Sequence, residues 1–390
     1  MLKRYNFDTD SKAGCAFDEH KARQGLSESE IHAEGSNVRK LLTLLMPVEW
    51  VLVWFGVLVI ALYRYFGIPM PGGPGTRGED GPILFYIKQV LTAADLYALI
   101  LFCFLAFECW RLVNRHHYRV RDVDWRGFLT HMLTRLHGEQ LVQDARFMNA
   151  LLIMFVEFAL LKNLIPLINP ALYDTWFLAA DQLVCGGSTC SQMLHSVLGI
   201  SPGVVSFVSE NYFWYYPYMS LVAMIFIVGA PRVLAQRYLC TFVLVFMLGT
   251  VSIYAVPTWG PVYFEPQIFE FMRGTEINRL QQGLWRMKEI LEHHAGSREA
   301  IFMISGFPSL HIAVVLTGSV YLSHIHWAVA FLSWIFLLLT INSTLYLGWH
   351  YLLDDVGAVA LVYISYVLTS RMSWSWQGKV EYASIVSREG

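Results

Sequence analysis

The sequence predicts an all-α fold, a polytopic membrane helical bundle with about eight transmembrane helices. Of its 390 residues, 55% are apolar and only 15% are charged, against about 25% charged in typical soluble domains. The apolar residues come in blocks close to the roughly 20 residues that a spanning helix needs. The alternating ten-residue strands of a membrane barrel are absent. A net charge of −2 gives no reason to expect nucleic acid as a partner.

The apolar blocks give the predicted transmembrane helices. Backbone groups in lipid must satisfy their own hydrogen bonds, so each block is read as a helix. The short HIHW connection between two late blocks fits a helical hairpin. The predicted spans are 43–64, 90–110, 148–168, 213–230, 238–256, 307–322, 327–347 and 355–370.

Three stretches between these spans are not expected to cross. Residues 67–83 read as a Gly/Pro-rich outer loop, and 111–147 as a basic cytoplasmic segment with a surface helix. Residues 169–212 contain no Lys or Arg and are rich in Trp, Phe and Leu. Such a composition suits a segment in the membrane interface.

The distribution of Lys and Arg predicts the orientation. Segments 1–42 and 111–147 contain seven each, and the short turn 231–237 and the tail after 370 contain more. With eight spans these segments fall on one side, so both termini are expected in the cytoplasm. Because residues 1–40 are polar and charged, without a short apolar region and cleavage site, no signal peptide is expected. The expected location is the plasma or inner membrane in a bacterium, or a Golgi-type membrane in a eukaryote.

One segment departs from this charge pattern. Residues 257–304 contain five basic residues yet fall on the outer side. Either the topology differs there, or the loop uses its positive charge.

The six cysteines contain one local pair. Cys185 and Cys190 bracket the loop CGGSTC, whose glycines permit a tight turn. A disulfide and two free thiols are equally open, depending on the compartment that the loop faces. The CxxC…CxxC spacing of a metal site is absent.

The block SGFPSLH, which ends at His311, reads as a helix N-terminus. Pro308 suits the first turn and Ser309 can cap it. Free N–H groups at such an end bind anions, phosphate included. A capped membrane helix with an interfacial histidine is the alternative.

The block STLYLGWHYLLDD contains a second histidine, His350, four residues before Asp354. That spacing stacks both side chains on one helix face. A carboxylate on one ring nitrogen fixes the tautomer and leaves the other nitrogen as a nucleophile or base. Both blocks begin spans on the same side, so His311 and His350 are expected at one depth. Polar groups at membrane depth are functional by default.

The two blocks together resemble the second and third signature motifs of the type 2 phosphatidic acid phosphatase (PAP2) superfamily. Residues 308–311 fit the PSxH motif. Ser343, His350 and Asp354 fit the third motif, with Thr344 where an arginine is expected.

A finer resemblance points to one branch of that superfamily. The form STxYLxxHYxxD together with GFPSLH is closer to the Aur1-like inositol phosphorylceramide synthase branch. VPTWGPVYF at 256–264 resembles a segment of that branch. The first motif, Lys and Arg-Pro seven residues apart, is not found. The predicted organisation is a cytoplasmic segment 1–42, two extra helices with a basic segment 43–147, a PAP2-like six-helix core 148–370 and a cytoplasmic tail 371–390.

The resemblance implies a phosphohistidine mechanism with no metal and no cofactor. His350 would be the nucleophile, oriented by Asp354, and His311 would protonate the leaving oxygen. Ser309 and the backbone near Gly306 would hold phosphate oxygens. The active site would lie at the non-cytoplasmic face.

The missing motif arginines leave the phosphate-binding cation open. The outer loop offers candidates, since LQQGLWRMKEILEHH reads as an amphipathic helix. A solvated helix face that binds anionic headgroups is the alternative. The candidates are Arg279, Arg286, Lys288 and Arg298.

Two other groups of residues have open roles. Glu108, Glu157 and Lys162 lie in or near spans, where they would form a buried structural pair between the first helices and the core or line a polar path. The aromatic cluster at 211–218 reads as an interface belt, with a stacking site for a sugar or inositol ring as the alternative.

The favoured function is a lipid phosphotransferase that moves a phospho-headgroup, for example phosphoinositol, between a donor and an acceptor lipid through phosphohistidine. The first alternative is a lipid phosphate phosphatase with water as acceptor. A metal-dependent enzyme would use His311, His350, Asp354 and Asp355 as ligands. A non-catalytic scaffold or transporter is the last alternative. Membrane lipids are the expected partners.

Overall fold

The computed structural model describes residues 45–68, 126, 138–293, 304 and 306–372. Those from Pro47 onward belong to one compact unit. Within the described residues all regular structure is helical and no strand is present, which confirms the predicted all-α fold.

The helices follow one another with short connections. Long helices alternate with several short ones. The elements are α3 (Pro47–Tyr65), α6 (Gly138–Lys162), α7 (Ile165–Ile168), α8 (Asp174–Val184), α9 (Cys190–Leu198), α10 (Pro202–Phe213), α11 (Tyr215–Met224), the π-helical η3 (Ile225–Gly229), α12 (Arg232–Ala255), α13 (Pro261–Phe264), the 3₁₀-helical η4 (Pro266–Met272), α14 (Glu276–His293), α15 (Leu310–Leu322), α16 (Trp327–Tyr346) and α17 (Leu352–Arg371).

Five of the described helical stretches are long and apolar enough to cross a membrane. They are α3, the continuous run from α10 to η3, α12, α16 and α17. Helix α15 is apolar but shorter, with 13 residues. Helix α6 covers most of the span expected at 148–168 and ends at Lys162. The protein is an integral membrane protein; the span expected at 90–110 lies outside the described residues.

Two boundaries differ from those that the sequence predicted. The span expected at 213–230 begins at Pro202, where Ser201 caps the helix and accepts the N–H of Val204. Residues 231–237, expected to form a turn, instead begin α12. Ala230 and Pro231 alone separate η3 from α12, which starts at Arg232. A proline at the start of a helix is compatible with helical structure.

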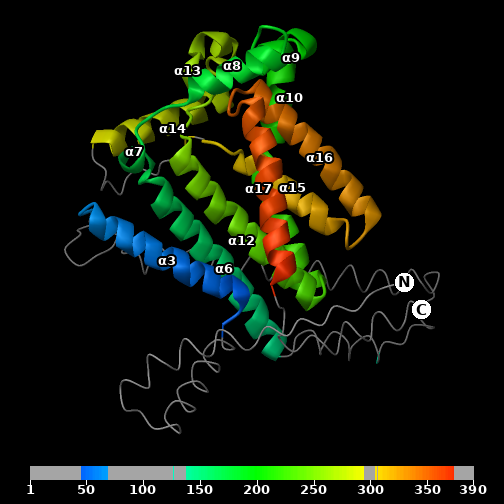
Figure 1. Cartoon of the computed structure of the whole chain (residues 1–390). Coiled ribbons are helices and arrows are strands. Elements are labelled where there is room, and N and C mark those ends of the chain that lie inside the picture. The colour runs from blue at the N-terminus through cyan, green and yellow to red at the C-terminus, as the bar shows by residue number, and fades with distance from the viewer. Residues whose placement is uncertain (1–44, 69–125, 127–137, 294–303, 305, 373–390) are drawn as a thin grey trace, which may run out of the picture. The chain divides into compact units, whose positions relative to one another are not determined.

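Helix α12 lies at the centre of the bundle. It packs against α3, α6, α15 and α17 (Figure 1). Of the most apolar 18-residue window of α12, 72% is buried inside the protein, whereas only 22% of the corresponding window of α3 is buried. A helix that is apolar all round belongs inside a bundle, and α12 therefore forms the wall on which the later helices assemble.

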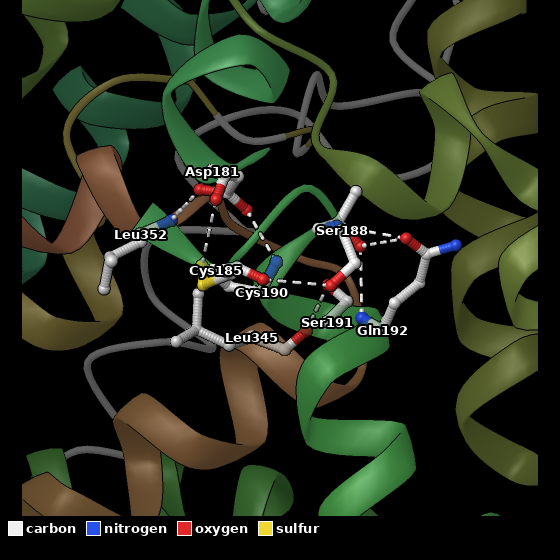
Figure 2. The surroundings of a disulfide bond; sticks show 9 residues. Asp181, Cys185, Ser188, Cys190, Ser191, Gln192, Leu345 and Leu352 are labelled. Carbon is white, nitrogen blue, oxygen red and sulfur yellow. Dashed lines mark hydrogen bonds between the residues drawn. A yellow bond between two sulfur atoms is a disulfide. The ribbon is translucent and has the colours of Figure 1, made fainter. Parts of the chain in front are cut away.

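Four helices form what we call the end layer: α8, α9, α13 and α14. They gather at the end of the bundle where α16 stops and α17 starts (Figure 1). Helix α8 contacts α17, and α9 contacts α16. Cys185 and Cys190 form a disulfide between the end of α8 and the start of α9 (Figure 2). Of the two possibilities for this pair, the structure shows the bonded one.

Candidate active site

The turn between α16 and α17 positions His350. Gly348 has φ +71° in this turn, and a Cβ there would lie 2.4 Å from the ring of Phe269. Both conditions require glycine. The Gly348 carbonyl accepts the N–H of Val262 at 2.9 Å, which ties the turn to α13.

His350 and Asp354 form a buried pair. Nδ1 of His350 lies 3.1 Å from Oδ2 of Asp354, and the same oxygen accepts the N–H of Tyr351 at 3.0 Å. The His350 side chain is only 2% exposed. Burial, and to a smaller extent the charge of Lys162, lowers the pKa of His350 below its usual range. A neutral ring with Nδ1–H on the carboxylate leaves Nε2 with a free lone pair.

His311 lies directly opposite that lone pair. It stands in the first turn of α15, which Ser309 caps by accepting the N–H of Ile312. Nδ1 of His311 is 3.3 Å from Nε2 of His350. The N–H of Ser309 donates to the carbonyl of Asp354 at 3.0 Å. The two sequence blocks thus bind each other through main chain and side chains, and their histidines meet at one depth.

Two carboxylates of α8 hold this arrangement from the end layer. Asp174 accepts the N–H groups of Trp259 and Gly260 and the hydroxyl of Tyr351 at 3.0 Å. Asp181 accepts the N–H of Leu352, the first residue of α17, at 3.0 Å (Figure 2). Burial raises the pKa of both carboxyl groups, and their N–H donors oppose that rise.

The last carbonyls of α16 also have side-chain donors in the end layer. Ser191 donates to the carbonyl of Leu345 at 2.7 Å (Figure 2). Nε2 of His195 lies 2.8 Å from the carbonyl of Tyr346. Burial lowers the pKa of His195, so the neutral ring donates this bond. These partners satisfy groups that a helix end leaves open and fix the turn that carries His350.

A cavity of about 480 Å³ opens beside the two histidines. His311 and His350 lie on its wall, together with Gly306. The rest of the wall is mainly aromatic and aliphatic, with side chains from α6, α11, α12 and α14. Phe158 of α6 and Leu284 of α14 are examples. The chemistry of this wall fits the apolar part of a lipid.

Lys162 supplies the cavity's positive charge. It ends α6, is 5% exposed and is the one Lys or Arg among the described residues that line the cavity. Its ammonium group lies 5.4 Å from the centroid of the Phe158 ring. Sequence reasoning did not assign it to the site.

A signal for Lys162 was nevertheless present. Asn169-Pro170 follows it by seven residues, the spacing of Lys and Arg-Pro in the first PAP2 motif. Asparagine replaces the arginine, and its amide donates to the carbonyl of Tyr254 at 3.1 Å. A search that requires the guanidinium therefore misses the lysine.

Three of the four cations predicted on the loop before α15 do not line this cavity. Lys288 forms an ion pair with Glu292 at 2.8 Å. Arg279 and Arg286 are exposed. None of these three basic residues lines the cavity, and Arg298 lies outside the described residues. Their role as phosphate ligands stays a prediction.

The other predicted phosphate ligands lie beside the histidines. Gly306 lines the cavity and packs on Ile253, which a Cβ would approach to 2.6 Å. Ser309 is fully buried, and its hydroxyl oxygen caps α15.

Part of the aromatic cluster at 211–218 faces the site instead of forming an interface belt. Tyr212, Tyr215 and Tyr216 line the cavity. The rings of Tyr212 and Tyr215 lie 5.2 Å and 4.6 Å from that of His311, centroid to centroid. In the described part of the chain, no group of three or more His, Cys, Asp or Glu side chains is arranged to hold a metal ion.

Fold and site together define an integral membrane protein with a His–His–Asp cluster whose two histidines lie on the wall of a mainly apolar cavity. Residues 175–368 match the model of the PAP2 superfamily. The match runs from α8 to α17 and contains both histidine blocks. No curated protein and no solved structure matches the chain significantly. The match supports a PAP2-type phosphatase or phosphotransferase acting on phosphoesters, without distinguishing a branch.

Proposed function

We propose that the protein is a lipid phosphotransferase that moves a phospho-headgroup between two membrane lipids through a phosphohistidine at His350. The hydrogen-bonded series Asp354–His350–His311 beside an apolar cavity carries this proposal. One ring nitrogen of His350 is bound to the carboxylate, and the other faces both the cavity and a second histidine.

The first half-reaction breaks the donor ester. Nε2 of His350 attacks phosphorus, and Asp354 stabilises the imidazolium that forms. The P–O bond breaks, its electron pair goes to the leaving oxygen, and that oxygen takes a proton from Nδ1 of protonated His311.

The second half-reaction reverses these steps. The acceptor hydroxyl gives its proton to His311, and its oxygen attacks phosphorus. The P–N bond breaks and its electron pair returns to Nε2 of His350. The enzyme ends in its starting protonation state.

Lys162 is the proposed phosphate-binding cation. Phosphoryl transfer needs positioning and positive charge around the equatorial oxygens more than covalent assistance. An ammonium group on the wall of a mainly apolar cavity interacts with phosphate more strongly than one in water.

The wall of the cavity favours transfer over hydrolysis. A nucleophile that is 2% exposed beside aromatic and aliphatic side chains is shielded from water, which would otherwise compete with the acceptor. The assignment of phosphoinositol as the headgroup rests on the Aur1-like form of the motifs alone. The non-cytoplasmic position of the site rests on the Lys and Arg distribution.

The testing experiment uses purified full-length protein in detergent with EDTA and a panel of radiolabelled phospholipids, with and without ceramide or diacylglycerol. We expect label in a new lipid with wild type and with His324→Ala, whose exposed side chain lies between α15 and α16. We expect none with His350→Ala. Free phosphate regardless of acceptor would indicate a phosphatase. Equal turnover by His350→Ala, or loss of activity in EDTA, would overturn the mechanism.

A further inference from the structure

Tyr212 is bound to His311 on the side away from His350. Its hydroxyl lies 3.2 Å from Nε2 of His311. The side chain is 3% exposed, and its ring stacks on that of Trp349 at 5.3 Å between centroids and an angle of 13°. The phenol is therefore held in place by the residue that precedes His350.

The direction of each hydrogen bond in this series follows from the carboxylate. An ionised Asp354 can only accept, so Nδ1 of His350 donates and Nε2 accepts. Nδ1 of His311 must then be the donor to His350, which leaves Nε2 of neutral His311 as an acceptor. Only the hydroxyl of Tyr212 meets that acceptor among the described residues. Tyr212 thus selects the tautomer that points a proton at the reaction centre.

The same hydroxyl suits the protonated ring. A phosphoryl group bound at Nε2 of His350 replaces the bond between the two histidines, and its ester oxygen comes next to Nδ1 of His311. When His311 is an imidazolium, its Nε2–H donates, and the phenol oxygen accepts. A hydroxyl can donate to Nε2 of neutral His311 and accept from Nε2–H of protonated His311, whereas the phenyl ring of phenylalanine can do neither.

We propose that Tyr212 is a positioning residue for the acid–base catalyst His311, keeping its Nδ1 aimed at the ester oxygen through both protonation states. This inference rests on the proposed function, since it assigns His311 the proton transfer. The residues that face His311 are Tyr212 from α10, Tyr215 from α11, His350 from the turn, and, by its charge, Lys162 from α6.

Tyr215 provides a matched control. Its ring is 4.6 Å from that of His311, and it also lines the cavity, but the structure shows no hydrogen bond from its hydroxyl to His311. Tyr212→Phe and Tyr215→Phe therefore each remove a hydroxyl from a ring that neighbours His311, and only the first removal breaks a hydrogen bond to that histidine.

The test uses diacylglycerol as the acceptor and compares two phosphate donors: octyl phosphate, whose alkoxide needs protonation, and 4-nitrophenyl phosphate, whose phenolate leaves without it. We expect Tyr212→Phe to lower kcat/KM, which reports the first half-reaction, roughly tenfold or more for octyl phosphate and less than about twofold for 4-nitrophenyl phosphate. Tyr215→Phe is expected to change both rates by one common factor. In a His311→Ala background, Tyr212→Phe should have no further effect, because it acts through that ring.

The outcomes separate the two proposals. Equal loss on both esters with Tyr212→Phe, or an undiminished effect in the His311→Ala background, would overturn the role of Tyr212 while leaving the proposed function intact. Wild-type levels of turnover by His350→Ala, or no turnover of either ester by wild type with diacylglycerol present, would overturn the proposed function itself. Melting temperatures are measured for all variants, so that a decrease in turnover caused by loss of folding is recognised.

Discussion

Two buried lysines, Lys162 and Lys288, lie in different regions and have opposite surroundings. Each is 5% exposed. In the end layer, Lys288 is paired with Glu292 at 2.8 Å and lies 4.5 Å and 4.3 Å from the ring centroids of Trp259 and Trp285. Within the described residues Lys162 makes no ion pair; it faces the cavity with the two histidines.

The difference indicates which charge is available to a ligand. A lysine with its own carboxylate and two indole rings is already stabilised, and its role is to hold α14 against the neighbouring loop. A buried ammonium group without a carboxylate is unfavourable by itself, and in membrane proteins such groups mark functional sites. We therefore propose that the cavity supplies the chemistry and that the end layer supplies rigidity.

The largest effect is expected from Asp354, the carboxylate bonded to His350. Asp354→Asn keeps the shape but removes the charge that fixes the His350 tautomer, so we expect kcat to fall about 10³- to 10⁴-fold, as in comparable His–Asp pairs. The matched control is Asp355→Asn, a neighbouring buried carboxylate without a hydrogen bond to His350. A comparable loss in both variants would contradict a specific role for Asp354.

The two lysines themselves give the next largest effect. Lys162→Met removes the charge proposed to bind the phosphate, and we expect a loss of about 10²- to 10³-fold in kcat/KM with little change in Tm. Lys288→Met is expected to leave the chemical step within a few-fold and to lower the free energy of unfolding by about 1 kcal/mol. Steady-state kinetics and thermal melts of both variants measure this contrast. A large loss of kcat/KM in Lys288→Met with none in Lys162→Met would contradict it.

A smaller effect is expected from the disulfide of the end layer. Cys185 and Cys190 are five positions apart, and the loop-entropy relation gives about 2 kcal/mol for a ring of this size. We expect Cys185→Ser with Cys190→Ser to lower the free energy of unfolding by that amount in denaturant titrations. Activity of the folded fraction should persist, since Asp181 binds Leu352 independently. Cys240→Ser, which alters a buried free cysteine, controls for the loss of a thiol.

The smallest expected effect is a pH dependence of stability. Burial lowers the pKa of His195, so the unfolded chain takes up a proton first as the pH falls, and stability decreases below about pH 6.5. Glutamine can donate the same bond to the Tyr346 carbonyl without titrating. We therefore expect His195→Gln to lose less Tm than wild type between about pH 7.5 and about pH 5.5. An identical loss in both proteins would show that other groups dominate.

The sequence predicted the late helices well because their signals are local. Ser309 caps α15, and the glycine-containing turn before His350 separates α16 from α17, close to the predicted ends. The juxtaposition of the two histidines followed from topology alone, since both blocks begin helices on one side of the bundle.

The parts that the sequence did not reveal depend on contacts between distant segments. Asp174 and Asp181 resemble ordinary residues of a surface helix until α8 is placed against the turn at 351–352. Tyr212 resembles an interface aromatic until α10 packs on α16 and the Tyr212 hydroxyl reaches His311. Lys162 was not predicted as a site residue because Asn169 stands where the motif has arginine. The basic residues of α14 were predicted because they are numerous, but their number does not determine the direction in which their side chains point.

The most direct test of the central claim is to trap the phosphoenzyme. Full-length protein would be mixed with donor lipid radiolabelled in the headgroup phosphate, quenched within milliseconds in alkali, and analysed for labelled peptide. We predict base-stable, acid-labile label on the peptide containing His350, which disappears when ceramide or diacylglycerol is added and is absent in His350→Ala. Turnover by wild type without such label, or label that persists in His350→Ala, would contradict the phosphohistidine mechanism.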